Sequence, residues 1–361
     1  MTRKQQYSCC SATPADIDLQ WLSKNSGKLF NTPILHQERQ AMLNNEPVAS
    51  CYDNCIHAEN QGLVSRRQLE QGNIKTHTEI DSLPTSVNIV LGSTCNLTCV
   101  YCCKQYSTAW LRDIEEFGPY IDHNRFKIFA SDQVKKHIEI QSDSDYKLIL
   151  TELAILSPDS INISGGEPFL YNNLYNLVSK SNAKTIRIHT GLGVEPARFK
   201  QQIDKLKDIK NVEILVSGES TEKLYELVRY GNKFNQFETN LKTIQKSGLQ
   251  YRMFCVISNL TVLGITDFFH YYQDSEFYFL LCNEPDFLAV NILDSNTKDI
   301  VIKQVQKLDH PIKSVILENI VKPVLPQQHK NFSKYIQEFA SRRNIALDIL
   351  PESLIYWIRN A

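Results

Sequence analysis

The stretch Cys95–Cys102, with the sequence CNLTCVYC, decides what fold and chemistry this chain is expected to have. It contains three cysteines, Cys95, Cys99 and Cys102. A cubane [4Fe–4S] cluster normally takes four cysteine ligands, so three thiolates leave one iron open. An open position in a metal site usually marks catalysis, because a substrate or cofactor can then bind the metal directly. The spacing therefore predicts a catalytic iron–sulfur cluster.

A structural zinc site is the alternative interpretation of these cysteines. Such sites usually pair two short cysteine motifs into four closed ligands. The gaps in Cys95–Cys102, three residues and then two, fit that arrangement poorly. A further cysteine, Cys103, follows Cys102 directly and is expected to point away from its neighbour's metal.

A second motif, Gly165-Gly166-Glu167-Pro168, follows the apolar run Ile161–Ser164. Two glycines allow a backbone to approach a ligand closely, and the Glu167 carboxylate can bind an ammonium group. Taken alone, such a run more often marks a turn, since Gly and Pro punctuate chains strongly. Its place one expected strand after the cysteine loop favours a ligand-binding role.

Together, the cysteine spacing, the aromatic Tyr101 before the last cysteine and the Gly-Gly-Glu run resemble the radical S-adenosylmethionine family. The resemblance implies that S-adenosylmethionine binds the open iron and is cleaved to a 5′-deoxyadenosyl radical, which abstracts hydrogen from a substrate. It also implies that Gly165, Gly166 and Glu167 contact the methionine amino group and that Tyr101 lies against the adenine. Flavodoxin or ferredoxin is the electron donor that this family leads us to expect.

Length and periodicity predict an α/β fold, a partial (β/α)6 TIM-like barrel. The chain has 361 residues, 42% of them hydrophobic and 22% charged, while (β/α) barrels commonly occupy roughly 200–250 residues as one domain. We therefore expect a cysteine-containing N-terminal region at 1–83, the barrel at 84–290 and a helical extension at 291–361. Short β-branched runs alternate with helical patterns, as in βα units, and predict strands at Val87–Leu91, Ser160–Ser164, Thr185–Thr190, Val212–Ser217, Tyr251–Asn259 and Phe277–Cys282. The helical patterns predict helices at Tyr146–Leu156, Pro196–Leu206, Thr221–Tyr230 and Asn240–Ser247, the last ending at Gly248. The long insertion Ala109–Ser144 after the cysteine loop is expected to cover the site.

Polar residues at the ends of these strands are further candidates, because chemistry in parallel barrels sits at the C-terminal strand ends. They are Thr190, Ser217, Glu219 and Asn259. The family resemblance places Ser217 and Glu219 near the ribose hydroxyls and the methionine carboxylate, and Asn259 beside the adenosine. The alternative is that each only closes a strand and begins a turn.

A second cysteine group, Cys9, Cys10, Cys51 and Cys55, precedes the expected barrel. The stretch Glu38–Pro47 followed by Cys51 and Cys55 resembles the twitch domain-containing radical S-adenosylmethionine proteins. In related enzymes such a domain follows the barrel and holds an auxiliary iron–sulfur cluster, whereas here the cysteines come first. We expect either a second cluster or a zinc site that recruits His57.

Composition narrows the possible partners. Thirty-nine basic residues face 40 acidic ones, for a net charge of −1, which argues against a broad nucleic-acid footprint. The polar N-terminus predicts no signal peptide, and no apolar run is long enough to span a bilayer. Ten cysteines then suit a cytoplasmic protein with reduced thiols.

The substrate is the open question at this stage. By analogy with related maturases, one hypothesis is oxidative modification of a peptide. A second is radical modification of a small metabolite, and a third is a non-catalytic iron–sulfur or zinc sensor. The sequence contains no obvious peptide-binding element.

Overall fold

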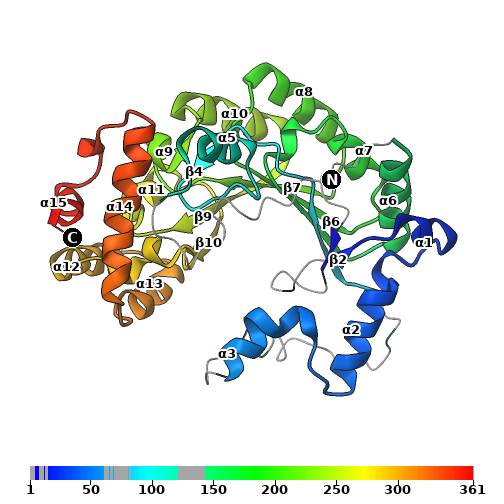
Figure 1. The fold of residues 1–361 in the computed structure, drawn as a ribbon. Coiled ribbons are helices and arrows are strands. Elements are labelled where there is room, and N and C mark those ends of the chain that lie inside the picture. The colour runs from blue at the N-terminus through cyan, green and yellow to red at the C-terminus, as the bar shows by residue number, and fades with distance from the viewer. Residues whose placement is uncertain are drawn as a thin grey trace. The chain divides into compact units, whose positions relative to one another are not determined.

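The computed structural model describes residues 5–7, 12, 15–60, 65, 68, 80, 83–120 and 143–360. Its largest sheet has six strands, and their order in space is their order along the chain. The pairs β6–β7, β7–β9 and β9–β10 are parallel, and the sheet is curved (Figure 1). Parallel strands in chain order with helices between them form βα units, so the predicted partial barrel is confirmed. The six strands are β3 (Ser86–Val90), β5 (Ser160–Ser164), β6 (Thr185–Thr190), β7 (Val212–Ser217), β9 (Gln250–Ile257) and β10 (Phe277–Leu281).

These strands agree closely with the predicted ones. The prediction ran two residues too far at Asn259, because β9 stops at Ile257. Beyond it, the Ser258 N–H donates to Thr261 Oγ1 at 2.9 Å and starts a turn. A side chain that hydrogen-bonds to the backbone a few residues away in this way competes with the strand hydrogen bonds and ends the strand.

Alternation along β6 separates the two faces of the sheet. Ile186 and Ile188 are fully buried, whereas Arg187 and His189 lie on the opposite face and are only partly buried. The helices α8 (Pro196–Leu206) and α10 (Phe234–Ser247) cover one side of the sheet (Figure 1). Successive side chains on a strand point to opposite faces of the sheet. The face that carries Arg187 and His189 can therefore hold polar groups.

Two predicted helices have different bounds in the structure. The predicted Asn240–Ser247 helix begins earlier, at Phe234, because its buried Phe237 continues the apolar stripe of Leu241 and Ile244. The predicted Thr221–Tyr230 helix is shorter, since α9 spans Glu222–Val228. The next two residues form β8 (Arg229–Tyr230), which pairs antiparallel with β4 (Thr98–Cys99) in the cysteine loop.

The segment after the cysteine loop begins with the helix α5 (Thr108–Phe117), capped by the Ser107 side chain. Residues 121–142, which we expected to cover the site, lie outside the described part of the chain. Within that part, no helix is long and apolar enough to cross a bilayer.

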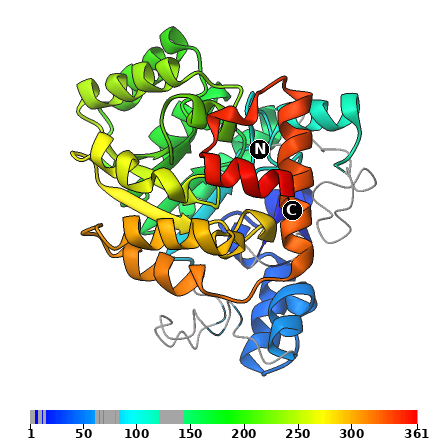
Figure 2. The ribbon, with the colours of Figure 1, turned by 90° about the vertical axis from the view of Figure 1, so that its left-hand side faces the viewer.

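Helices make up the C-terminal segment, as predicted. They are α12 (Ser295–Val305), α13 (Ile312–Ile320), α14 (Pro326–Arg342) and α15 (Glu352–Asn360). A further helix, α11 (Ile265–Tyr271), lies earlier, between β9 and β10. Figure 2 shows α15 lying across α14. Phe332 of α14 stacks on Trp357 of α15, with 4.9 Å between ring centroids, and Ser333 Oγ donates to the Ile358 carbonyl.

The chain forms two compact units. One contains residues 1–88, 136–161 and 176–185, and the other contains residues 89–135, 162–175 and 186–361. The domain boundaries predicted at 83 and 290 stay predictions. Elements of the first unit include the pair β1 (Gln5–Gln6) and β2 (Ala15–Asp16), with α1 (Leu19–Lys24), α2 (Pro33–Leu43), α3 (His57–Asn60), α6 (Asp143–Leu156) and most of α7 (Leu174–Lys180).

A buried carboxylate organises the first unit. Glu152 of α6 is fully buried. Its two oxygens accept the Gly27 N–H at 2.9 and 2.8 Å, and they also accept the Ser26 hydroxyl at 2.9 Å and the Leu29 N–H at 3.3 Å. A carboxylate that accepts several backbone N–H groups forms charge-assisted hydrogen bonds, which are stronger than neutral ones.

We expect Glu152→Ala to lower the free energy of unfolding by about 3 kcal/mol, because buried donors lose their acceptor. Amide exchange at Gly27 and Leu29 should quicken in the same variant, as measured by hydrogen exchange. The exposed Glu46→Ala is the control. Unchanged exchange at Gly27 and Leu29 would contradict the anchoring role.

Candidate functional site

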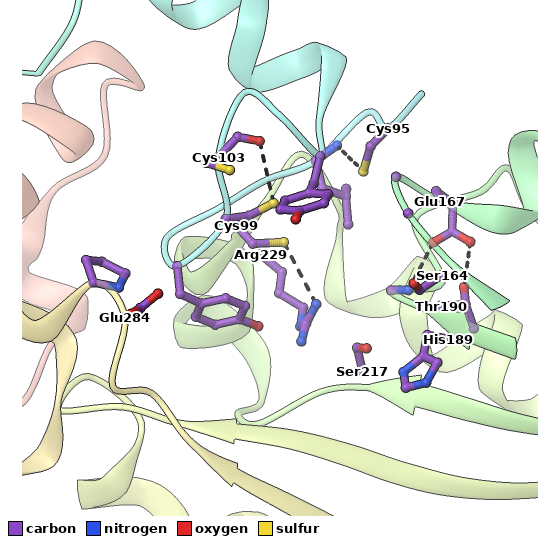
Figure 3. A pocket seen from close by; sticks show the side chains of 18 residues that line it. Cys95, Cys99, Cys103, Ser164, Glu167, His189, Thr190, Ser217, Arg229 and Glu284 are labelled. Carbon is purple, nitrogen blue, oxygen red and sulfur yellow. Dashed lines mark hydrogen bonds between the residues drawn. The ribbon is translucent and has the colours of Figure 1, made fainter. Parts of the chain in front are cut away.

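A cavity of about 460 Å³ opens at the C-terminal ends of the barrel strands. It brings together the cysteine loop after β3, the glycine loop after β5, and residues at the ends of β6, β7 and β10 (Figure 3). Its lining includes most of the predicted site residues: Cys95, Cys99, Tyr101, Cys102, Gly165, Gly166, Glu167, Thr190 and Ser217. The carboxyl ends of strands are where α/β proteins bind ligands.

Backbone hydrogen bonds from distant elements hold the cysteine loop. The Leu97 carbonyl accepts from Ser107 Oγ at 2.6 Å, and the Cys99 carbonyl accepts from Trp110 Nε1 at 3.0 Å. Asn96 Nδ2 donates to the Gly193 carbonyl at 2.7 Å. Buried backbone groups must be paired, so these contacts fix the direction in which the thiols point.

Helix α14 also contributes to the loop. Tyr335 O–H donates to the Val100 carbonyl at 2.5 Å, and Arg343, directly after the helix, donates through Nε to Thr98 Oγ1 at 3.2 Å. Asp113 of α5 pairs with Arg343 at 3.0 Å and with Arg342 at 3.1 Å. Helix α14 and the residue that follows it therefore help to hold the cysteine loop in place.

The glycine loop packs against the cysteine loop too closely for any side chain. Gly165 has φ +90°, and a Cβ there would lie 2.5 Å from Val90 Cγ1 and 2.9 Å from the Gly92 carbonyl oxygen. Gly166 has φ +53°. The Glu167 N–H donates to the Thr94 carbonyl at 2.9 Å. Both glycines are needed, because only glycine fits a left-handed backbone at such close approach.

The Glu167 carboxylate is buried, 1% exposed, and is oriented by neighbouring donors. It accepts from Thr190 Oγ1 at 2.8 Å, from the Gly191 N–H at 2.9 Å and from the Phe169 N–H at 3.2 Å. Burial nevertheless raises the pKa of Glu167 to about 7, although these hydrogen bonds favour the charged form. A cation at this position would restore the ionised form.

A buried ion pair lies beside Cys99. Arg229 Nη2 and Nε reach Glu219 at 2.8 and 3.2 Å, and Arg229 Nη1 lies 3.8 Å from the Cys99 Sγ. Tyr101 O–H donates to the other Glu219 oxygen at 2.6 Å. Burial opposes the charge of Arg229, but the Glu219 carboxylate holds the pKa of the guanidinium well above its ordinary value.

Burial holds the three thiols of the cysteine loop towards their neutral forms. It raises the pKa of Cys95 to about 12 and raises the pKa of Cys99 and Cys102, and charge on neighbouring cysteines adds to the effect at Cys95 and Cys102. Three thiolates so close together need a cationic group between them, and an iron–sulfur cluster would supply one. In the described ranges, no three His, Cys, Asp or Glu side chains converge on one ion position.

Two predicted residues lie outside the cavity lining. Glu219 is fully buried, and Tyr101 and Arg229 already occupy its carboxylate. Asn259 is also fully buried, and its Nδ2 donates to the Phe287 carbonyl at 3.3 Å. The contacts that we predicted from these two residues to a cofactor stay predictions.

The N-terminal cysteines are only partly described. Cys51 and Cys55 are buried, with Cys55 in a single π-helical turn, Tyr52–Ile56. Cys9 and Cys10 lie outside the described residues. The second metal site therefore stays a prediction.

The residues of the cavity lining that the sequence analysis missed include Arg229, His189, Glu284 and Cys103. Cys103 was expected to face away, but it lines the same cavity as its neighbour Cys102. His189 was not considered, although its place one residue before Thr190 on β6 was visible in the sequence. Burial, helped by the charge of Arg187, lowers the pKa of His189, so its imidazole is neutral at neutral pH.

The raised pKa of Glu167 makes a prediction about stability. A carboxyl whose pKa is higher in the folded state stabilises the protein when protonated, and this contribution is lost as the pH rises through the folded pKa. From pH 5 to pH 7, the ligand-free wild type should lose about 2 kcal/mol of unfolding free energy through this group. In Glu167→Gln the same pH range should give a flatter curve in urea unfolding. The exposed Glu116→Gln should keep the wild-type slope, and an equal slope in both variants would contradict the prediction.

The buried ion pair between Arg229 and Glu219 leads to a second prediction about stability. Arg229→Met should destabilise the protein by about 3–5 kcal/mol, because Glu219 is left buried and unpaired. The double variant Arg229→Met with Glu219→Gln should recover much of that loss. Denaturant unfolding of the four proteins forms a double-mutant cycle, and losses that simply add would show that the pair is not coupled.

Comparison with known proteins agrees with this geometry. Residues 89–268 match the model of the Radical SAM superfamily. A cysteine-type anaerobic sulfatase-maturating enzyme of Clostridium novyi (strain NT) is 22% identical over 197 residues, which are 52% of this chain and 47% of that enzyme. The match thus spans about half the length of that relative.

Two solved structures are also similar. One is native anSMEcpe with bound AdoMet, at 17% identity and TM-score 0.41 over 72% of this chain and 62% of that one. The other is Streptococcus suis SuiB bound to precursor peptide SuiA, at 15% identity and TM-score 0.40 over 84% of this chain and 54% of that one. We draw nothing further from likenesses this weak. The match over residues 89–268, together with the cysteine and glycine loops in one cavity, shows that the chain is an enzyme of the radical S-adenosylmethionine superfamily.

Proposed function

We propose that this enzyme holds a [4Fe–4S] cluster on Cys95, Cys99 and Cys102 and cleaves S-adenosylmethionine reductively. When bound, the cluster and S-adenosylmethionine supply a 5′-deoxyadenosyl radical that abstracts hydrogen from the substrate. The observation that carries the proposal is the shared cavity: three thiols and the Gly165–Glu167 loop line it from two neighbouring strand ends. Flavodoxin or ferredoxin is the expected electron donor, and the cytoplasm is the expected compartment.

The residues of the chain have separable tasks in this proposal. Gly165 and Gly166 let their loop pack directly against Val90, Gly92 and Thr94 at the cysteine loop, and Glu167 accepts the ligand's ammonium group. Thr190 orients the Glu167 carboxylate through its hydroxyl. Tyr101 and Ser217 line the rest of the cofactor space, with Glu219 and Asn259 behind them as the predicted supporting contacts.

We propose a peptide as the substrate, and oxidative modification as the reaction. Two observations support this proposal. The matching Clostridium novyi enzyme is named for maturating another protein. In addition, large apolar side chains remain exposed on β10, where Tyr278 is 40% and Leu280 is 55% exposed. Exposed apolar groups beside a cavity suit an extended ligand better than a small polar metabolite.

A second metal site at Cys9, Cys10, Cys51 and Cys55 is part of the proposal, as an auxiliary cluster or a zinc site. Burial of both Cys51 and Cys55 supports it. An auxiliary cluster would accept the electron that an oxidative modification releases.

The deciding experiment is anaerobic reconstitution, followed by iron and sulfide counts, EPR of the reduced protein and assay of 5′-deoxyadenosine with dithionite and S-adenosylmethionine. We expect the wild type to form 5′-deoxyadenosine and the Cys95/Cys99/Cys102→Ala variant to form none. The neighbouring Cys103→Ala is the matched control and should retain its catalytic cluster. A wild type that binds S-adenosylmethionine but never cleaves it would favour a sensor.

EPR of the same reconstituted proteins also tests the second metal site. If the triple variant keeps an iron–sulfur EPR signal, and Cys51→Ala with Cys55→Ala removes it, the auxiliary cluster is supported. Zinc in place of that signal would leave only the zinc alternative, and a metabolite would become the better substrate proposal.

A further inference from the structure

One carboxylate in the cavity has no task in binding the cofactor. Glu284 follows β10 and lines the cavity together with Pro285. Figure 3 places it across the cavity from Glu167 and Thr190. Unlike Glu167, it is exposed to solvent, and no hydrogen bond or ion pair joins its carboxylate to any residue in the described ranges.

The other charges around the cavity are already matched. Among the residues that the structure describes, Arg229 is the one guanidinium in the lining, and it forms a buried pair with Glu219. Deeper on the same sheet face, Glu213 pairs with Arg187 at 2.9 Å and with Arg252 at 2.8 Å. Glu284 therefore presents negative charge to whatever enters the cavity from its side.

The strand that leads to Glu284 offers apolar surface on the same face. Tyr278 pairs directly with Phe254 on β9, which in turn pairs with Ser217 of the cavity lining. Directly paired residues of parallel strands point to the same face. Leu280, two residues after Tyr278, shares that face, while Phe277 and Phe279 face the other way and contact Phe269 of α11.

We propose that Glu284, which follows the exposed Leu280 of β10 along the chain, binds a cationic side chain of the peptide substrate: a lysine or arginine. The ammonium or guanidinium group would meet the Glu284 carboxylate, and apolar parts of the same peptide would lie along Leu280. Charge complementarity selects this occupant. The assignment deepens the proposed function, since it rests on a peptide substrate reaching the cavity.

Binding of short fluorescent peptides to the reconstituted holoenzyme with S-adenosylmethionine, followed by anisotropy without reductant, tests this assignment. The peptides differ only at the central residue, which is lysine, arginine, norleucine or glutamate. An exposed ion pair contributes up to about 1 kcal/mol, or about five-fold in affinity, so the wild type should bind the lysine and arginine peptides about five-fold more tightly than the norleucine peptide. Glu284→Gln should remove the preference, and Glu284→Lys should reverse it towards a central glutamate.

The control is Glu318→Gln, an exposed glutamate of α13, which should keep the wild-type preference. Equal affinities for lysine and norleucine peptides in the wild type would overturn the assignment, as would a preference that survives in Glu284→Gln. Absence of 5′-deoxyadenosine in the wild type would instead overturn the proposed function. Because binding is measured without reductant, the two failures are distinguishable.

Discussion

The structure of this site depends on hydrogen bonds that hold a loop with almost no secondary structure of its own. The cysteine loop contains only a two-residue strand, Thr98–Cys99. Its buried carbonyls would be costly if they were left unpaired. Three side chains from elsewhere satisfy three of them: Ser107, Trp110 and Tyr335.

Because one of these side chains is Tyr335, helix α14 is part of the site. Tyr335 is separated from Val100 by 235 residues along the chain, yet its hydroxyl fixes the peptide between Val100 and Tyr101. The rings of Phe287 and Phe339 pack around Tyr335, with centroids 5.0 and 5.9 Å away. A loop that must present three thiols is thus supported on one side by α5 and on another by α14.

Sequence analysis predicted the parts of this enzyme that local patterns encode. β-Branched runs located all six strands, and Pro196 and Gly248 marked the start of α8 and the end of α10. The cysteine spacing and the two glycines identified the loops that meet in the cavity. These signals lie within short windows of sequence, where periodicity and turn chemistry are informative.

Residues whose role depends on pairing between distant segments were not predicted. Arg229 lay in a stretch that looked helical, and only its pairing with Cys99 as β8 and β4 turns it towards the cavity. Tyr335 and Glu284 carry no local motif. Glu219 was singled out as a polar residue after a strand, but no local pattern in the sequence indicated that Arg229 and Tyr101 would occupy its carboxylate.

The balance of charge in the cavity explains why Glu219 lies behind the lining. Four thiols and two carboxylates line the cavity, and burial holds the thiols of Cys95, Cys99 and Cys102 and the carboxyl of Glu167 towards their neutral forms. Each of these groups ionises more readily when a cation arrives. Without Glu219, the positive charge of Arg229 would itself favour the ionised thiols and Glu167. The cavity would then select less strongly for cationic ligands. By neutralising Arg229, Glu219 leaves the positive charge to be supplied by the groups that we propose to bind here: iron, an ammonium group and, at Glu284, a basic side chain.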